Sequence, residues 1–251
     1  MLSLLSGILG KAVLWGYLTR NPVSAVEKPT QRRSRVVRPL VPATVEAVRR
    51  LLLTSGQHGD ATLVSVLAYA GLRPGEALAL QWRDILDRTI VVDKAVSLGK
   101  VKDTKTRASR AVRLLAPLAA DLREWRLASG CPAPSALVFP ARDGDVFSED
   151  DYRNWRRRVF KPSLADVGLP ETRPYDLRHS FVSLLIAEGT HVIEVARQAG
   201  HSPTMTLDTY GHVFDEASGA EGASAEEAIL LARHVPVTYP DSELSISERR
   251  A

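Results

Sequence analysis

The stretch that decides the fold reads Tyr-Asp-Leu-Arg-His at residues 175–179, followed by Gly-His at 200–201 and by a tyrosine at 210. Apolar residues recur from Leu177 to Leu185 at helical spacing, so this stretch is predicted to form a helix with one buried face. Arg178 is predicted to flank that face. Arginine suits the binding of a phosphate because its planar guanidinium holds two oxygens at once and stays charged at any physiological pH.

A second stretch lies far upstream, at residues 71–76, and reads Gly-Leu-Arg-Pro-Gly-Glu. Proline is favoured in the first turn of a helix, so Arg73 is expected at a helix start, where backbone amides also favour anions. Arg73 is therefore a candidate phosphate-binding residue. A third stretch, Thr-Lys-Thr at 104–106, stands ahead of Ser109, Arg110, Val112 and Leu114.

In their order along the chain, 71–76, 104–114 and 175–210, the three stretches resemble the signature motifs of the tyrosine recombinases, the phage integrase family. The resemblance implies an α+β fold, in which a mainly helical catalytic domain carries a small antiparallel β-sheet (the integrase-like, DNA breaking-rejoining fold). It also implies an enzyme, a tyrosine-type site-specific recombinase that cuts and rejoins duplex DNA during recombination or the integration of a mobile element.

The resemblance assigns a role to each motif residue. Arg73 and Arg178 hold the scissile phosphate, His201 hydrogen-bonds to it, and Tyr210 attacks the phosphorus. The attack leaves a covalent 3′-phosphotyrosyl link and a free 5′-hydroxyl. Forming the phenolate of an unperturbed tyrosine at pH 7 costs about 4 kcal/mol, and the nearby cations Arg73, Arg178 and Lys105 are expected to lower that cost.

Lys105 is, by the same resemblance, the general acid that protonates the leaving 5′-oxygen. Lysine suits this role because its proton is mobile, whereas that of arginine is not. Lys100 and Lys102 lie close by in the sequence and remain alternatives, although the Thr-Lys-Thr context favours Lys105.

Tyr175 stands where the family usually has a histidine. Tyrosine is a poor proton acceptor near neutral pH, but its hydroxyl can still position the nucleophile or a phosphate oxygen. This predicts slower or differently timed chemistry; the alternative is a half-buried packing residue. His179 follows Arg178 directly and is turned by about 100° around the helix from it. Its position in the family is usually structural.

Four segments are expected along the chain. Residues 1–22 resemble the last helix of a truncated core-binding domain, because a helical pattern from Leu2 to Leu18 leads into Arg-Asn-Pro at 20–22. Residues 23–40 are predicted to be a basic linker, residues 41–235 the tyrosine recombinase catalytic domain, and residues 236–251 a flexible C-terminal tail.

Positive charge is concentrated at the start of the chain. Residues 1–40 hold seven lysines and arginines against one acidic residue, Glu27, whereas the whole chain has a net charge of only +4. Such a segment is typical of an arm that follows a phosphate backbone, although a solvated linker has the same composition.

Hydrophobic periodicity predicts a mainly helical pattern from Thr44 onward. Further helices are expected at residues 118–127, 149–160, 175–187, 192–199 and 223–233. The β-branched run at 85–92 and the apolar run at 111–115 predict the strands of a small antiparallel sheet.

Composition bounds the remaining possibilities. A chain of 251 residues with 45% hydrophobic content can bury one substantial domain, and no apolar run is long enough to predict a membrane span. Cys131 is the only cysteine, which excludes an intrachain disulfide and fits a reducing cytosol. The resemblance implies a DNA-associated protein in the cytoplasm of a prokaryote. No P-loop and no metal-ligand spacing occurs, so neither a cofactor nor a metal is implied.

The partner implied by the resemblance is duplex DNA, bound by a homotetramer on paired recombination sites; accessory DNA-bending proteins are not specified. Two alternatives remain open. One is a truncated DNA-binding or regulatory relic with impaired recombination. The other is a type IB topoisomerase, which fits less well because the chain is short and its motifs are integrase-like.

Overall fold

The computed structural model describes residues 2–26, 39–97, 99–103, 109–169, 171–217 and 224–234. The chain divides into two compact units, Met1–Val36 and Val37–Ala251. The division lies inside the segment that the sequence predicts to be a basic linker. None of the described helices is long and apolar enough to cross a membrane.

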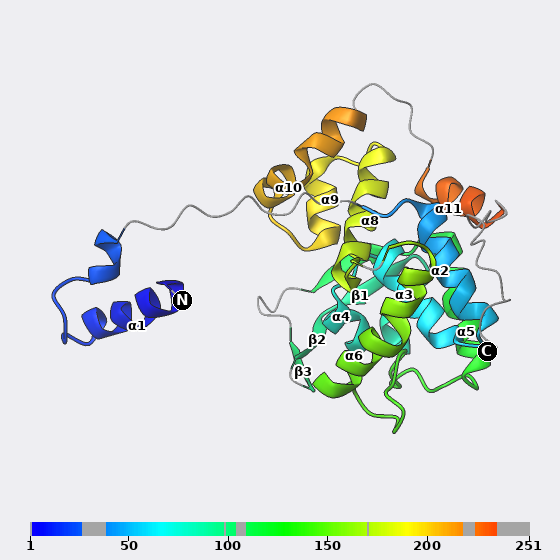
Figure 1. Cartoon of the computed structure of the whole chain (residues 1–251), viewed down its shortest axis with the longest axis horizontal. Coiled ribbons are helices and arrows are strands. Elements are labelled where there is room, and N and C mark those ends of the chain that lie inside the picture. The colour runs from blue at the N-terminus through cyan, green and yellow to red at the C-terminus, as the bar shows by residue number, and fades with distance from the viewer. Residues whose placement is uncertain are drawn as a thin grey trace, which may run out of the picture. The chain divides into compact units, whose positions relative to one another are not determined.

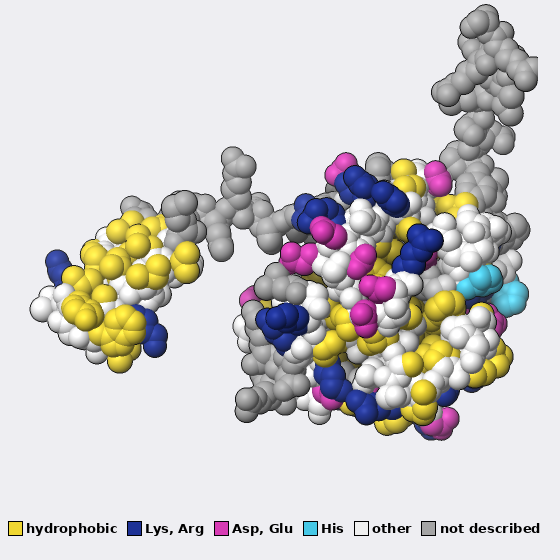
Figure 2. Space-filling model, turned by 90° about the horizontal axis from the view of Figure 1, so that it is seen from below, with side chains coloured by type: hydrophobic (Ala, Val, Ile, Leu, Met, Phe, Trp, Pro, Cys, Tyr) yellow, Lys and Arg dark blue, Asp and Glu magenta, His cyan; other side chains and the backbone are white. Residues whose placement is uncertain are grey.

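The first unit contains α1 (Leu2–Leu14) and a short 3₁₀ helix, η1 (Pro22–Ala25). Asn21 joins the two, because its Nδ2 donates to the Ser6 carbonyl oxygen at 2.9 Å while its side-chain oxygen accepts from the Val23 amide at 3.0 Å. No side chain of α1 is buried. Exposed hydrophobic side chains cover much of this unit in Figure 2. The predicted helix is thus present but ends at Leu14.

The second unit is mainly helical with two small antiparallel sheets, which confirms the predicted α+β class (Figure 1). Its helices are α2 (Pro42–Thr54), α3 (His58–Tyr69), α4 (Pro74–Ala79), η2 (Trp82–Asp84), α5 (Ala116–Ala128), α6 (Glu149–Trp155), the π-helical η3 (Arg156–Phe160), α7 (Lys161–Asp166), α8 (Pro174–Ala187), α9 (Val192–Ala199), α10 (Pro203–Ala217) and α11 (Ala225–His234). Its strands are β1 (Thr89–Val92), β2 (Lys94–Ser97), β3 (Lys100–Asp103) and β4 (Arg110–Arg113).

Helix α3 forms the centre of the core. Every residue from Ala61 to Tyr69 is buried, and the helix packs against α2, α5 and α8. A helix that is apolar on all sides is stable only when other elements surround it. The chain then turns at Gly71 into α4, so the residues that follow α3 are fixed against the core.

The two sheets flank the helical core. β1 pairs with β4 in the register Thr89↔Arg113 to Val92↔Arg110, and β2 pairs with β3. Ile90 and Val92 alternate with half-buried neighbours, as expected for a strand with one covered face. The predicted antiparallel pairing is confirmed, although the first strand starts only at Thr89, since Ile85 forms an isolated bridge to Ile90.

Helices α8, α9 and α10 pack against one another and carry the carboxy-terminal motif (Figure 1). The helix predicted at 192–199 is confirmed with the same bounds, and that predicted at 175–187 begins one residue earlier. The helix predicted at 149–160 continues through a π-helical turn to Asp166. Helix α10 was not predicted, because Gly200 and Pro203 break the apolar pattern just before it.

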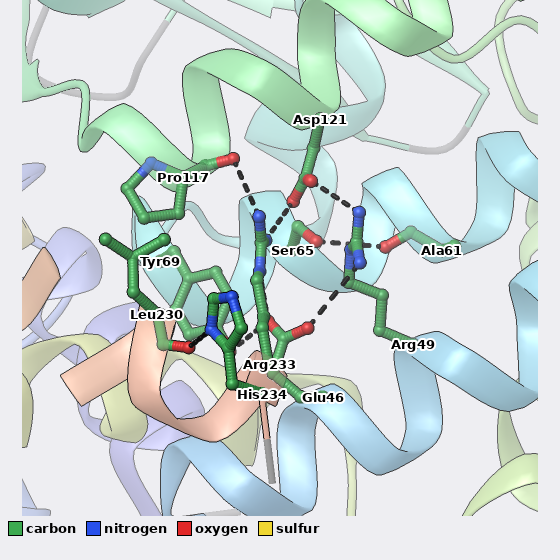
Figure 3. Close-up of polar contacts among 10 residues, drawn as sticks. All are labelled: Glu46, Arg49, Ala61, Ser65, Tyr69, Pro117, Asp121, Leu230, Arg233 and His234. Carbon is green, nitrogen blue, oxygen red and sulfur yellow. Dashed lines mark hydrogen bonds and ion pairs between the residues drawn. The ribbon is translucent and has the colours of Figure 1, made fainter. Parts of the chain in front are cut away.

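A buried ionic cluster holds α11 on α2 and α5 (Figure 3). Arg233 of α11 lies 2.7 Å from Asp121 and 3.2 Å from Glu46, while Arg49 pairs with the same two carboxylates. The Tyr69 hydroxyl donates to Glu46 at 2.7 Å. The helix predicted near 223–233 is therefore found at 225–234, fixed to its own chain by charge as well as by apolar contacts.

We expect Arg233→Ala to lower the free energy of unfolding by about 3 kcal/mol, because it leaves two buried carboxylates with a single remaining arginine. Urea denaturation at pH 7 measures the change. Arg123→Ala, which removes an exposed arginine from α5, is the matched control and should cost less than about 0.5 kcal/mol. Equal stabilities of the two variants would contradict a structural role for the cluster.

Candidate active site

Arg178 on α8 is completely buried, with 0% of its surface exposed. Its Nη1 donates to the Gly71 carbonyl oxygen, and its Nη2 lies 3.0 Å from His201 Nε2. Burial, followed by the charge of Arg73, lowers the pKa of Arg178 to about 10, so the side chain stays positive at neutral pH. The sequence predicted an arginine beside the core, and the structure places it inside the core.

Gly71 makes this arrangement possible. Its φ is +59°, and a Cβ atom there would lie 2.3 Å from Cδ1 of Phe181. Any other residue would therefore push α8 away from the connection between α3 and α4. The close approach keeps the Gly71 carbonyl within reach of Arg178.

Arg73 precedes the first turn of α4, at a helix start as predicted. Its Nη1 donates to Glu76 Oε1 at 2.9 Å, and its Nη2 donates to the Gly200 carbonyl oxygen at 2.9 Å. The side chain is 39% exposed, so a ligand can reach it from solvent. Arg73 thus connects the start of α4 with the end of α9.

Glu76 is a buried carboxylate between two arginines. Arg110 donates to both of its oxygens, at 3.0 and 2.6 Å, and Arg73 donates through its side chain and its backbone amide. Burial by itself raises the pKa of Glu76, but the hydrogen bonds and charges of Arg110 and Arg73 outweigh it and lower the pKa to about 2. Glu76 is therefore ionised at neutral pH.

His201 follows the left-handed Gly200 that ends α9, and its amide donates to the Ala196 carbonyl oxygen at 2.9 Å. Burial, then the charges of Arg178 and Arg73, lower the pKa of His201 to about 3, so the ring is neutral at pH 7. Because Arg178 can only donate, His201 Nε2 accepts in this arrangement and Nδ1 carries the proton. Nδ1 is buried and has no hydrogen-bond partner among the described residues.

Tyr210 on α10 is completely buried, and its hydroxyl contacts Nδ1 of His179. Burial raises the pKa of Tyr210 above its ordinary value, and the charge of Arg178 offsets this only in part. The charge of Arg178 thus acts in the expected direction and lowers the cost of the phenolate, but in this buried position the loss of hydration outweighs that attraction. The candidate nucleophile is held in its protonated form.

Tyr175 lies on the solvent side of the same group. It is 40% exposed, and its ring meets the ring of His179 edge-on, with 5.5 Å between the centroids. The His179 ring is in turn 5.6 Å from that of Tyr210. His179 therefore links the residue that replaces the usual histidine to the candidate nucleophile, and burial lowers its own pKa.

The candidate general acid, Lys105, lies outside the described residues. The two alternative lysines, Lys100 and Lys102, are exposed on β3. Among the residues that the structure describes, no three His, Cys, Asp or Glu side chains form a group that could hold a metal ion.

The structure thus brings Arg73, Arg178 and His201 together at the end of α9, whereas Tyr210 and Tyr175 meet through His179. Sequence reasoning gave no chemical role to Glu76, Arg110 or His179, although all three stand inside the motifs. The place of Arg110 inside the third motif was a usable signal. Its pairing with a carboxylate 34 positions away was not visible in the sequence.

The profile of the phage integrase family matches residues 39–217, which include every described residue of this site. The chain belongs to the phage integrase family. Its similarity to individual members is moderate. It is 32% identical over 202 residues to the tyrosine recombinase XerC of Xanthomonas axonopodis pv. citri (strain 306), covering 79% of this chain and 61% of that protein.

A second relative is the ICEBs1 integrase of Bacillus subtilis (strain 168), 30% identical over 226 residues, with 84% of this chain and 60% of the relative covered. The chain thus spans about three fifths of the length of these curated relatives. Among solved structures, the fold is similar to the Tn1549 transposon integrase in complex with a circular intermediate DNA (TM-score 0.65, 20% identity, 82% of this chain and 71% of that one). It is also similar to a lambda integrase dimer bound to a core site (TM-score 0.57, 17% identity), with 81% of this chain and 71% of that one covered.

The lowered pKa of His201 predicts how stability depends on pH. Below pH 6.5 an unfolded histidine binds a proton that folded His201 does not bind until about pH 3, so the free energy of unfolding should fall as pH falls through this range. His201→Gln should give a smaller fall between pH 6.5 and 4.5, measured by urea denaturation. His58→Gln, which replaces an exposed histidine outside the site, is the matched control for the substitution itself. An unchanged slope in His201→Gln would contradict the assignment.

Proposed function

We propose that this chain cuts and rejoins duplex DNA at specific sites through a covalent 3′-phosphotyrosyl intermediate. The observation that carries the proposal is the contact of buried Arg178 with His201, next to the partly exposed Arg73. Two cations and an imidazole at one helix end suit a group with several charged oxygens, such as a phosphodiester. The names of the relatives, a tyrosine recombinase and an integrase, support the same reading.

The first step is the binding of the scissile phosphate by the two arginines. Arg73 is open to solvent, whereas Arg178 has no exposed surface in this DNA-free state, so formation of the complex has to uncover it. Burial and the charges of the arginines keep His201 neutral; the phosphate charge opposes the second of these, so binding raises the pKa of His201 from about 3. His201 is then able to donate a hydrogen bond to a non-bridging oxygen, where negative charge develops during attack.

The second step exchanges one phosphate ester bond for another. A bond forms between the Tyr210 oxygen and phosphorus, and the bond between phosphorus and the 5′-oxygen breaks. The phenolic proton passes to a neutral base at the position from which Tyr210 attacks. Lys105 gives a proton to the leaving 5′-oxygen. Religation reverses these transfers, and because the ester bond is conserved the cycle requires no nucleotide hydrolysis.

Tyr210 has to leave its buried position before it can attack. Its hydroxyl contacts His179, and its side chain has no exposed surface in this DNA-free state. Contacts with DNA therefore have to stabilise a second position of the nucleophile, which ties cleavage to the formation of a complete complex.

The remaining parts extend this proposal. Residues 1–22 are the last helix of a core-binding domain, residues 23–40 a basic linker that follows the DNA backbone, residues 41–235 the catalytic domain, and residues 236–251 a tail. The working assembly is a homotetramer on paired sites in the cytoplasm of a prokaryote. Asn21, Pro22 and the exposed apolar face of α1 fit a helix that packs against other parts of such a domain.

Tyr210→Phe should abolish covalent attachment to DNA, because the substitution removes only the attacking oxygen. Nicked duplexes with a random central sequence serve as suicide substrates, and the adducts are captured on a denaturing gel. Tyr152→Phe, which changes a half-buried tyrosine of α6, is the matched control and should retain capture.

Two outcomes would count against the proposed function. One is the absence of any adduct with the unsubstituted, folded chain at low salt. The other is continued capture by Tyr210→Phe, which would move the nucleophile elsewhere.

A further inference from the structure

Arg110, the first residue of β4, uses its whole guanidinium group inside the protein. Its Nη1 and Nη2 bind the two oxygens of Glu76, and its Nε donates to the Gln198 carbonyl oxygen at 2.9 Å. The side chain is only 11% exposed. Arg110 therefore has little surface left with which to bind DNA itself.

The Glu76 end of this contact leads to Arg73. Oε1 of Glu76 accepts from Arg110 and from Arg73 Nη1, while Oε2 accepts from Arg110 and from the Arg73 amide. The two arginines thus hold the Glu76 carboxylate, and the carboxylate in turn holds the Arg73 amide and Nη1. Without Glu76 in this position, the Arg73 side chain would be freer to rotate and less well oriented toward a phosphate.

The Gln198 end leads to His201. Arg110 binds the carbonyl of Gln198 and Arg73 binds that of Gly200, so two arginines hold the last carbonyl groups of α9. A Cβ atom on Gly200 would lie 3.3 Å from the Arg110 side chain, which shows how closely the two pack. Cations at a helix C-terminus are favourable, and His201 is the next residue along the chain.

We propose that Arg110 is a positioning residue of this active site, which orients Arg73 through Glu76 and His201 through the end of α9. The inference rests on the proposed function, since it assigns these two residues to one phosphate. Arg110 touches neither the phosphate nor the nucleophile, and acts only through other residues.

Charge gives Arg110 a second effect on the same site. Glu76 is ionised and lies beside Arg73, where an uncompensated carboxylate would repel a phosphate. With Arg110 present, the three guanidinium groups of Arg73, Arg110 and Arg178 face one carboxylate. Without it, Arg73 and Glu76 neutralise one another and only Arg178 remains in excess.

Arg113 supplies an internal comparison on the same strand. Its Nη1 and Nη2 bind the two oxygens of Glu188 at 2.9 Å, which joins β4 to the end of α8. The geometry is as well formed as that of the Arg110 pair, yet neither partner binds Arg73 or precedes His201. Loss of the Arg113 side chain therefore shows how much the cleavage rate depends on a purely structural arginine–glutamate pair of β4.

The test compares Arg110→Ala, Arg110→Lys and Arg113→Ala on a nicked duplex captured by the unsubstituted chain. Arg110→Ala should lower the single-turnover cleavage rate about 30- to 100-fold with a change in duplex affinity below about threefold, because misaligned groups slow the reaction more than they weaken binding. Arg110→Lys keeps the charge but cannot bind Glu76 and Gln198 together, so its cleavage rate should lie between that of Arg110→Ala and that of the unsubstituted chain. Arg113→Ala should cleave within about threefold of the unsubstituted chain.

A second measurement does not depend on cleavage. In an NMR titration of the DNA-free chain, Arg110→Ala should raise the pKa of His201, because a nearby cation is lost and the end of α9 is released. Arg113→Ala should leave that pKa unchanged.

The two failures can be told apart. If the unsubstituted chain forms no adduct, the proposed function fails and the titration still tests the positioning. If it does form adducts, equal cleavage rates for Arg110→Ala and Arg113→Ala, complete rescue by lysine, or an unchanged His201 titration in Arg110→Ala would overturn the inference. Should Arg110→Ala not fold, Arg110→Lys and Glu76→Gln provide the same comparison.

Discussion

The rest of the structure depends on the burial of one positive charge, that of Arg178. A guanidinium group inside a core is costly unless polar groups meet it, and here a backbone carbonyl and a histidine do so. The carbonyl belongs to Gly71, whose lack of a side chain allows Phe181 to pack against it. Burial, together with the same charge, keeps His201 neutral. Core packing and site electrostatics are therefore one constraint, not two.

The second arginine is held differently, because like charges repel at short range. Arg73 is oriented by two acceptors, the Glu76 carboxylate and the Gly200 carbonyl at the end of α9. The first is negatively charged and the second carries a partial negative charge. The carboxylate is kept ionised by Arg110, which arrives from a strand far away in sequence. Without a ligand, this site has more positive than negative charge, and its arginines repel one another. A bound anion reduces that repulsion.

Much of this site could be predicted from the sequence, and the reasons for the failures are physical. The positions of Arg73 at a helix start and of Arg178 beside an apolar stripe follow from local rules about proline and periodicity, which neighbouring residues determine. Helix α9 was predicted to the residue because Gly200 ends its stripe. The contact of His179 with Tyr210 and that of Arg110 with Glu76 join segments that only tertiary packing brings together. Local periodicity contains no information about such pairs. It also missed α10, which packs against α8 and α9.

Tyr210 is held in a buried, protonated position that differs from the one needed for the proposed attack on a phosphate. A buried phenol whose pKa is raised is chemically inert, and its contact with His179 ties it to a ring that Tyr175 covers on the outside. Leaving this position costs apolar burial and a hydrogen bond, and nothing within the described site offsets that cost. Under the proposed function, the compensation comes from the phosphate, whose charge satisfies Arg73 and Arg178, and from contacts that DNA makes elsewhere on the chain. The proposed cleavage would then be restricted to complexes in which these contacts exist, since the burial that keeps Tyr210 protonated also keeps its hydroxyl out of reach of water and of phosphates that bind only transiently.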